Sequence, residues 1–322
     1  MAGIRQHYIP QFLQRGFASH TIGSEIYTWV HRKGTRSFNA NVKKVGVEKE
    51  FYTEGEDTQA DDLITDAEGR FGELVEILKA NPVGAVSDPQ IPRFIAHLEV
   101  RTRHIRQNFL QSGNRLIEKL LEFMADDHAF STYLQKECFR DPVRRQFLPL
   151  FMMQFKAERS KIVARLRSDF SSALARGAKN GHIQGLKMAI APEWKVRRYD
   201  EFKFHIIEPN DGPLILGDSA ILFHVQGQSA YKTFLDKSDE VKQVILPLSP
   251  QRALIGATDR DASLPNNICR ALARCSLEYF ISAENSERNS LLMEEIGEDA
   301  DIVPKEVIEQ MISERLGIIG NP

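Results

Sequence analysis

Apolar residues recur every three or four positions between Asp61 and Lys79, which is the spacing of one face of an α-helix. The stripe consists of Ile64, Ala67, Phe71, Leu74, Val75 and Leu78. Glu68 falls inside it, four residues after Ile64 and three before Phe71. Asn81-Pro82 ends the predicted helix, because a proline cannot continue it. This helix therefore carries a carboxylate on the face that should be buried.

A second helix is predicted to begin at Ser87-Asp88-Pro89, where a capping residue precedes a proline. Its apolar face carries Phe94, Leu98, Ile105 and Phe109. Arg101 lies on the same face, three residues after Leu98 and four before Ile105. A buried charge is costly unless it is paired and hydrogen-bonded. We therefore expect Glu68 and Arg101 to face each other or a shared polar cavity.

The remaining pattern divides into helical and extended stretches. From 116 to 176 the spacing stays mostly helical, and the glycines between 177 and 185 are expected to break the helix. Pro209-Asn210-Asp211-Gly212 is a hairpin-turn signal. Alternating apolar residues predict strands over 25–30, 202–207, 214–216, 220–225, 241–246 and 252–255. Closing helices are predicted over 266–277, 286–296 and 305–316.

These elements indicate an α+β fold, because runs of strands are separated from runs of helices. Strands dominate residues 1–55, helices dominate 60–180, and strands with closing helices fill 195–318. The N-terminal strand can join the C-terminal sheet. We therefore expect a single domain over 1–322, with the helix-rich middle packed with a mostly antiparallel sheet from the two outer parts.

A short apolar segment precedes all of these elements. Pro10 stands where a helix begins, at a position where a missing N–H costs nothing, and Gly16 ends it. Large apolar residues share one face of this helix: Phe12, Leu13 and Phe17. We expect the segment to be buried against the rest of the protein, because those residues would not stay in solvent. The polar side chains at its edge are His7, Gln11 and Arg15.

The stretch His7-Tyr8-Ile9-Pro10-Gln11-Phe12-Leu13, followed by Arg15 and Phe17, resembles the opening signature of an uncharacterised bacterial family, domain-of-unknown-function family 4238 (DUF4238). Further stretches fit the same family in order: Glu50-Phe51-Tyr52, Asp66 with Glu68, Phe94-Ile95-Ala96 leading to Arg101-Thr102, Leu216-Gly217-Asp218-Ser219, and Pro247-Leu248-Ser249-Pro250. The resemblance covers most of the chain. It implies a shared fold, and the family brings no established activity.

The positions that carry the resemblance also include the charged candidates. Asp218 presents a carboxylate at the junction of two predicted strands, a common place for functional side chains. We therefore predict that one partly buried polar pocket is lined by His7, Arg15, Glu68, Arg101 and Asp218.

One interpretation of this pocket is catalytic. Two carboxylates and an imidazole suit a divalent cation such as Mg²⁺ or Mn²⁺, and arginines hold phosphate groups. His7, Glu68 and Asp218 would then be the catalytic residues and candidate metal ligands, with Arg15, Arg101 and Gln11 binding the substrate. The protein would be a metal-dependent hydrolase acting on a phosphate-containing or nucleic-acid substrate, that is, a phosphodiesterase or nuclease.

The alternative is a non-catalytic binding or regulatory protein in which the charged cluster is structural or binds an anionic ligand. It is favoured because the chain lacks the closely spaced set of two acidic residues and a lysine or histidine that is common in metallonucleases. The chain also has no Walker-type phosphate loop, dinucleotide fingerprint or Gly-x-Ser-x-Gly motif.

Composition further limits the kinds of partner that the protein is expected to bind. A net charge of −2 argues against a general nucleic-acid coating protein. Between Arg93 and Lys179, however, 17 Lys and Arg stand against 9 Asp and Glu, so weak, salt-dependent nucleic-acid binding is expected at most. Cys138, Cys269 and Cys275 match no zinc or redox spacing and are expected to be free thiols. Without a signal peptide or an apolar run of about 20 residues, we predict a cytoplasmic protein with no membrane partner.

Overall fold

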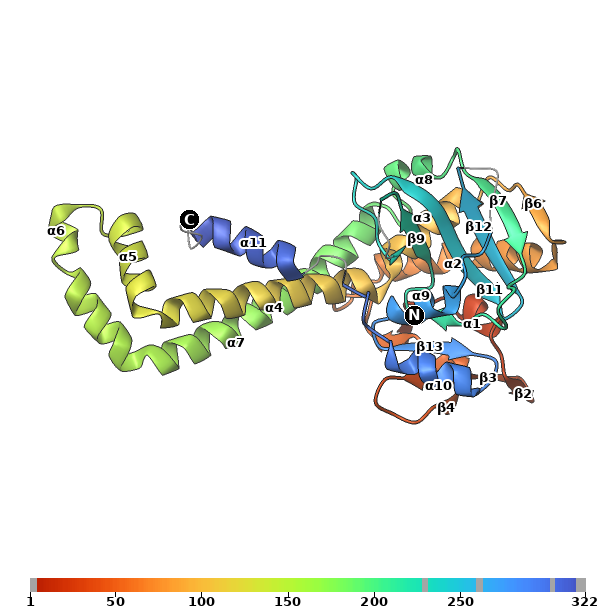
Figure 1. Ribbon diagram of the computed structural model, residues 1–322, viewed down its shortest axis with the longest axis horizontal. Coiled ribbons are helices and arrows are strands. Elements are labelled where there is room, and N and C mark those ends of the chain that lie inside the picture. Colours follow the sequence, from red (N-terminus) through yellow and green to blue (C-terminus); the bar gives the residue numbers. More distant parts are fainter. Residues whose placement is uncertain (1–4, 228–230, 259–262, 302–304, 317–322) are drawn as a thin grey trace. The chain divides into compact units, whose positions relative to one another are not determined.

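The computed structural model describes residues 5–227, 231–258, 263–301 and 305–316, and the statements below concern these residues (Figure 1). They form two compact units. Unit 1 combines Met1–Arg106 with Asn180–Ile302, and unit 2 combines Gln107–Lys179 with Val303–Pro322. Strands occur in unit 1 and long helices in unit 2, which confirms the α+β class.

Unit 1 contains a six-stranded antiparallel sheet in the order β10-β9-β11-β12-β7-β6. Its members are β6 (Gly84–Val86), β7 (Lys203–Ile207), β9 (Leu222–Val225), β10 (Tyr231–Lys232), β11 (Val241–Ser249) and β12 (Arg252–Ala257). The central antiparallel pair β11–β12 corresponds to the strands predicted over 241–246 and 252–255. Its strands are buried almost throughout, so the sheet provides much of the core.

A second sheet of unit 1 joins the two ends of the chain. It runs β2-β3-β13-β8, with β4 also paired to β3. The bounds are β2 (His20–Ile22), β3 (Glu25–Arg32), β4 (Phe38–Asn41), β8 (Leu216–Gly217) and β13 (Tyr279–Ser282). Pairing of Trp29 with Ser282 confirms that the N-terminal strand joins C-terminal ones. The short strands β1 (Arg5–His7) and β5 (Val47–Lys49) form a separate antiparallel pair.

The helices of unit 1 pack around these sheets (Figure 1). They are α1 (Gln11–Arg15), the 3₁₀ helix η1 (Val42–Lys44), α2 (Gln59–Ala80), α3 (Ile91–Arg101), α8 (Glu193–Arg198), α9 (Ile268–Arg274) and α10 (Glu287–Glu294). Every residue of the stripe predicted on α2 is buried, as expected from its helical spacing.

The segment from His7 to Phe17 is largely buried. Leu13 and Phe17 are fully enclosed in the main core. Phe12 differs from the prediction because it is half-buried, with its ring 6.0 Å from that of Phe94. Gly16 cannot carry a side chain, because a Cβ there would lie 2.2 Å from the carbonyl oxygen of Leu248. The segment is therefore seated directly on the β11–β12 hairpin.

The predicted helix beyond Ser87 is interrupted at Thr102. This residue is extended (φ −69°, ψ 154°), so α3 ends at Arg101 and α4 (Arg103–Ala125) begins after it. The interruption turns the following residues away from the predicted face. Ile105 is consequently half-buried and Phe109 exposed, and the expectation that both continue the apolar face is wrong.

Two other expectations about chain breaks are also wrong. The glycines between 177 and 185 do not end a helix, because α7 runs from Leu148 to Met188. Each glycine costs about 1 kcal/mol relative to alanine in a helix, and burial of the neighbouring Ile183 and Leu186 offsets that cost. Pro209–Gly212 does not form a hairpin, because β12 and β6 already occupy both edges of β7. The turn instead leads into the other sheet.

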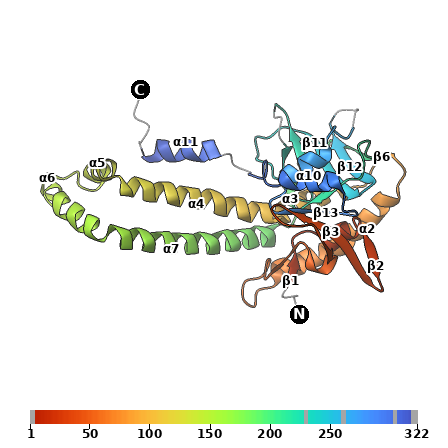
Figure 2. The ribbon, with the colours of Figure 1, turned by 60° about the horizontal axis from the view of Figure 1, so that its bottom comes forward.

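Unit 2 is helical. It contains most of α4 and α7, together with α5 (Asp127–Glu137), α6 (Pro142–Arg145) and α11 (Lys305–Leu316). Helices α4 and α7 lie side by side in both views, and α5 and α6 connect them at one end (Figures 1 and 2). A small core holds that end together: Phe123, Phe130, Leu134, Met152 and Phe155. No helix of the described residues is long and apolar enough to cross a membrane.

Candidate functional site

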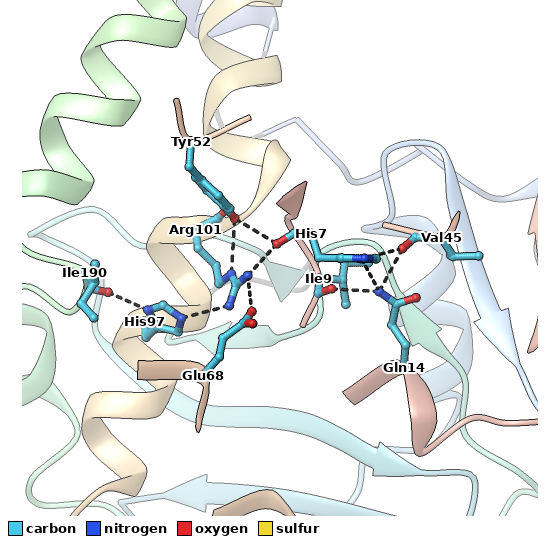
Figure 3. A network of polar contacts seen from close by, with 9 residues as sticks. All are labelled: His7, Ile9, Gln14, Val45, Tyr52, Glu68, His97, Arg101 and Ile190. Carbon is cyan, nitrogen blue, oxygen red and sulfur yellow. Dashed lines mark hydrogen bonds and ion pairs between the residues drawn. The ribbon is translucent and has the colours of Figure 1, made fainter. Parts of the chain in front are cut away.

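The guanidinium of Arg101 is the centre of a buried polar network in unit 1 (Figure 3). Its Nη2 lies 2.7 Å from Glu68 Oε1 and donates to the His7 carbonyl oxygen at 2.6 Å. Its Nη1 lies 3.1 Å from His97 Nε2, and its Nε donates to the Tyr52 hydroxyl at 3.4 Å. All three guanidinium nitrogens are therefore engaged by protein groups. The Arg101 side chain is only 1% exposed, against 30% for Glu68.

His97 serves this network as a neutral acceptor. Its Nδ1 lies 3.0 Å from the carbonyl oxygen of Ile190, so Nδ1 carries the proton and Nε2 is free to accept from Arg101. Burial lowers the pKa of His97 well below its usual value, and the charge of Arg101 lowers it further. The imidazole therefore stays uncharged beside the guanidinium.

Tyr52 links the network to the N-terminal strand. Its hydroxyl donates to the Arg101 carbonyl oxygen at 3.0 Å, and its backbone N–H donates to Gln6 Oε1 at 2.5 Å. Burial raises the pKa of Tyr52, so the phenol remains protonated. The contacts tie strand β1, the 51–52 segment and the end of α3 to one another. We call Arg101 with Glu68, His7, His97 and Tyr52 the Arg101 clamp.

The side chain of His7 lies next to this clamp and contacts the other side of the N-terminal segment. Its Nδ1 is 3.1 Å from the Val45 carbonyl oxygen, which Gln14 Nε2 also binds at 3.0 Å. Gln14 Nε2 donates to Ile9 O at 2.8 Å as well. Burial lowers the pKa of His7, although the Val45 hydrogen bond and Glu68 oppose this. His7 is therefore neutral, and no described residue hydrogen-bonds its Nε2.

A second arginine repeats the same arrangement. Arg106 donates to the Phe51 carbonyl oxygen at 2.6 Å and lies 3.9 Å above the Phe51 ring. It also lies 3.3 Å from His182 Nδ1, while His182 Nε2 donates to Val100 O at 2.9 Å. Burial lowers the pKa of His182 to about 4. Sequence reasoning missed this pair, because Arg106 follows the interruption at Thr102 and its face could not be assigned.

Asp218 takes part in a different set of contacts. Its carboxylate accepts backbone N–H groups of Leu277 at 2.7 Å and Glu278 at 2.8 Å, and lies 3.8 Å from His104 Nε2. Burial raises its pKa, while His104 and the backbone N–H groups oppose the shift. Asp218 therefore fixes the loop that enters β13, and no contact among the described residues joins it to Glu68.

The other predicted substrate-binding residues stand outside the clamp. Gln11 is half-buried and Arg15 is exposed. Arg15 affects the site only through its charge, which lowers the pKa of His7. Burial and the charge of Arg101 each lower that pKa more than Arg15 does. Among the described residues no three His, Cys, Asp or Glu side chains are grouped to hold a metal ion. Of the predicted residues, the structure thus brings together Glu68, Arg101 and His7.

A pocket of about 600 Å³ adjoins the segment that His7 and Gln14 hold. Strands β3 and β4, η1 and the 45–47 segment form its wall, together with Tyr8 and Tyr279. Its aromatic lining consists of Tyr8, Tyr27, Phe38 and Tyr279. Its charged lining consists of Arg32, Lys43, Lys44 and Glu25, so basic groups outnumber acidic ones. Sequence reasoning named Tyr8 only as part of the N-terminal signature and did not find this pocket.

The charges around the pocket are only partly neutralised. Lys43 pairs with Glu25 at 2.9 Å, and Arg32 lies 3.7 Å from Glu278. Lys44 forms no salt bridge with any described residue. At the buried side, the Tyr279 hydroxyl has no well-aligned hydrogen bond to the described residues, and Tyr8 is its polar neighbour. Burial raises the pKa of Tyr8 to about 12, so its hydroxyl can act as a donor.

Comparison with known proteins identifies the family. A family model described as "Protein of unknown function (DUF4238)" matches residues 5–307, and the chain therefore belongs to this family. This confirms the resemblance seen in the N-terminal signature. No curated protein and no solved structure matches the chain.

Proposed function

We propose that this protein is a non-catalytic binding protein that takes an anionic, aromatic small molecule into the pocket lined by Tyr8, Tyr279 and Lys44. The observation that carries the proposal is the combination of aromatic and basic side chains around a cavity of about 600 Å³. Ligand pockets typically have this size, an apolar and aromatic lining and a few polar groups that orient the ligand.

The Arg101 clamp has a structural role in this proposal. An arginine that binds phosphate must present free N–H groups to it. The guanidinium of Arg101 already contacts Glu68, His7 and other protein groups through all its nitrogens. A substrate phosphate would have to displace those contacts inside a buried site. Binding at the neighbouring pocket requires no such rearrangement.

The clamp also supports the wall of the pocket. His7 and Gln14 hold the Val45 carbonyl oxygen from one side, and Val45, Gly46 and Val47 line the pocket on the other. Gly46 has a positive φ of 63°, and a Cβ there would lie 3.0 Å from the Gln14 amide and 3.2 Å from the Tyr279 hydroxyl. Only glycine therefore fits between the clamp and the pocket.

Calorimetric titration with phenyl phosphate, phenol and inorganic phosphate tests this proposal. We expect phenyl phosphate to bind more tightly than either fragment, because it uses both the rings and the cation. Replacing Lys44→Gln should weaken binding about tenfold or more, since a charge-assisted hydrogen bond contributes roughly 1.5–3 kcal/mol. The variant Lys242→Gln, on the exposed side of β11, is the matched control. Equal affinities of the Lys44→Gln variant and the wild type would contradict the proposal.

A metal-dependent hydrolase remains a second candidate, favoured by the unbound Nε2 of His7 near the half-exposed Glu68. A neutral imidazole can accept a proton from water, and a carboxylate can bind Mg²⁺ or Mn²⁺. Hydrolysis of bis(4-nitrophenyl) phosphate with Mn²⁺ is the test. Activity that disappears in both His7→Gln and Glu68→Gln, in folded protein, would favour this candidate, and no activity in the wild type would count against it.

A further inference from the structure

The end of unit 2 that contains α6 (Figure 1) has several exposed apolar residues close together in the sequence. Val143, Phe147, Leu150 and Met153 are each between 51% and 64% exposed. We call α6 and the first two turns of α7, residues 142–153, the arm tip. Side chains of this size are normally scattered singly over a protein surface, whereas a contiguous group marks an interaction site.

The arm tip is apolar on both faces of α7. Its inward face places Met152 in the small core of unit 2, and Phe155 follows one turn later. Its outward face carries Leu150 and Met153, and the exposed Phe147 precedes the helix by one residue. A surface helix normally has a polar face toward water. Residues 148–153 at the start of α7 contain no polar side chain, so they are adapted to a second, non-aqueous environment.

The charge of the arm tip specifies what that environment is. Residues 142–157 contain no Asp or Glu. Arg144 and Arg145 are exposed and form no salt bridge with a described residue, while Lys156 at the edge pairs with Asp127 at 2.6 Å. A second copy of the same surface would be repelled by these arginines. The complementary partner is therefore negatively charged as well as apolar.

We propose that the arm tip binds an anionic lipid surface, which departs from the sequence-based prediction of no membrane partner. Exposed Phe and Leu beside basic residues are typical of segments that lie at a membrane interface. Two residues advance about 200° along a helix, so the exposed Phe151 and Met153 point to nearly opposite sides of α7. A single groove on a protein partner cannot cover both sides, whereas lipid can surround them. Aliphatic side chains such as Leu150 and Met153 offer little to nucleic-acid bases.

Co-sedimentation of the full-length protein with vesicles tests this proposal. We expect binding to vesicles of phosphatidylcholine with phosphatidylserine to exceed binding to phosphatidylcholine alone by about thirtyfold, the effect of two basic residues near an anionic surface. The double variant Arg144→Gln with Arg145→Gln should lose that preference. Equal binding to both kinds of vesicle, or binding to neither, would overturn the proposal, and the second result would favour an acidic protein partner instead.

Variants of the apolar side chains separate insertion from charge attraction. The double variant Phe147→Ser with Leu150→Ser should lose at least tenfold in vesicle affinity while its melting temperature stays unchanged, because both side chains are exposed. Ile77→Ser is the matched control, since Ile77 is similarly exposed on α2 but lies beside Glu73 and Glu76. An equal loss in the control would show that the effect is not specific to the arm tip.

A local reporter gives a second readout. The chain has only two tryptophans, Trp29 and Trp194, and neither is in the arm tip. In a Phe147→Trp variant, emission should shift to shorter wavelength on addition of phosphatidylserine-containing vesicles and remain unchanged with phosphatidylcholine alone. Sedimentation of the protein without this shift would mean that another surface binds the vesicles, which would also overturn the proposal.

Discussion

Helix α3 contributes one residue to each of two ion pairs. These two residues are only two positions apart, but the pairs lie in different environments. Glu99 pairs with Lys195, and the two side chains are 0% and 2% exposed. Arg101 pairs with Glu68, whose side chain is 30% exposed. Both pairs have further hydrogen-bond partners. They differ in how far the acid is removed from water, and that decides what each pair can do.

The buried pair has the features of a purely structural element. Glu99 also accepts the Leu235 N–H at 2.8 Å and the Tyr199 hydroxyl at 3.0 Å, so both carboxylate oxygens are bound. Burial lowers the pKa of Lys195, while Glu99 opposes the shift. Each charge exists in the core only because the other is present. In the Arg101 clamp, by contrast, the Glu68 side chain is 30% exposed, although the oxygen that faces Arg101 is buried.

Glu99→Gln should give the largest loss of stability among the substitutions of these charges. It retains the shape but leaves the Lys195 ammonium in the core without its counter-charge, which costs roughly 3–5 kcal/mol. Urea unfolding followed by circular dichroism measures the loss. Glu193→Gln is the control, because Glu193 pairs with Arg93 and Arg197 at the surface and such pairs contribute at most about 1 kcal/mol. Similar losses in the two variants would contradict the comparison.

Glu68→Gln should have a smaller effect. The Arg101 guanidinium keeps His7 O, His97 and Tyr52 as neutral acceptors, and the Glu68 side chain is partly exposed to solvent. We expect a loss of roughly 1.5–3 kcal/mol, the contribution of one charge-assisted hydrogen bond, in the same urea experiment. A loss as large as that of Glu99→Gln would show that Glu68 is as isolated from water as Glu99 is.

The two ion pairs also show what the sequence could predict. Glu68 and Arg101 each stand inside an otherwise apolar helical stripe, so their pairing followed from the cost of an unpaired buried charge. Glu99 gave no such signal, because it lies outside the predicted apolar face, whereas the structure buries α3 on nearly all sides. The sequence did offer one indication, because apolar residues occur all around this helix. In such a helix a charged residue outside the apolar stripe is also buried.

The contacts of Asp218 mark the limit of sequence reasoning. Its position between two strands and the strands themselves were predicted, as was the α+β class. Its partners, however, are backbone groups about 60 positions later in the chain, and no local pattern specifies such a pairing. The pocket near Tyr279 was missed for the same reason, since β13 contributes Tyr279 and the N-terminal segment contributes Tyr8. The single-domain prediction over 1–322 stays a prediction.

A pH titration sharpens the comparison, because Arg106 contacts the neutral imidazole of His182 as well as the carboxylate of Glu48, whereas Lys195 pairs with the carboxylate of Glu99. The pKa of His182 is lowered from 6.5 to about 4 by burial, and the charge of Arg106 contributes to the shift. Above pH 6.5 His182 is neutral in the folded and unfolded chain and has no effect on the pH dependence. As pH falls from 6.5 to about 4, the unfolded chain binds a proton that the folded protein excludes.

The free energy of unfolding should therefore decrease with falling pH in this range, by about 1.4 kcal/mol per pH unit for one such histidine. At neutral pH this effect on the free energy of unfolding vanishes, so it is the smallest of the predicted effects under those conditions. His182→Gln removes the titrating group while an amide can still donate to Val100 O and accept from Arg106, so its unfolding free energy should fall less steeply with acid. Urea unfolding at a series of pH values measures both slopes. Parallel slopes for the variant and the wild type would show that His182 accepts a proton in the folded protein, and the neutral-acceptor description of the arginine networks would then be wrong.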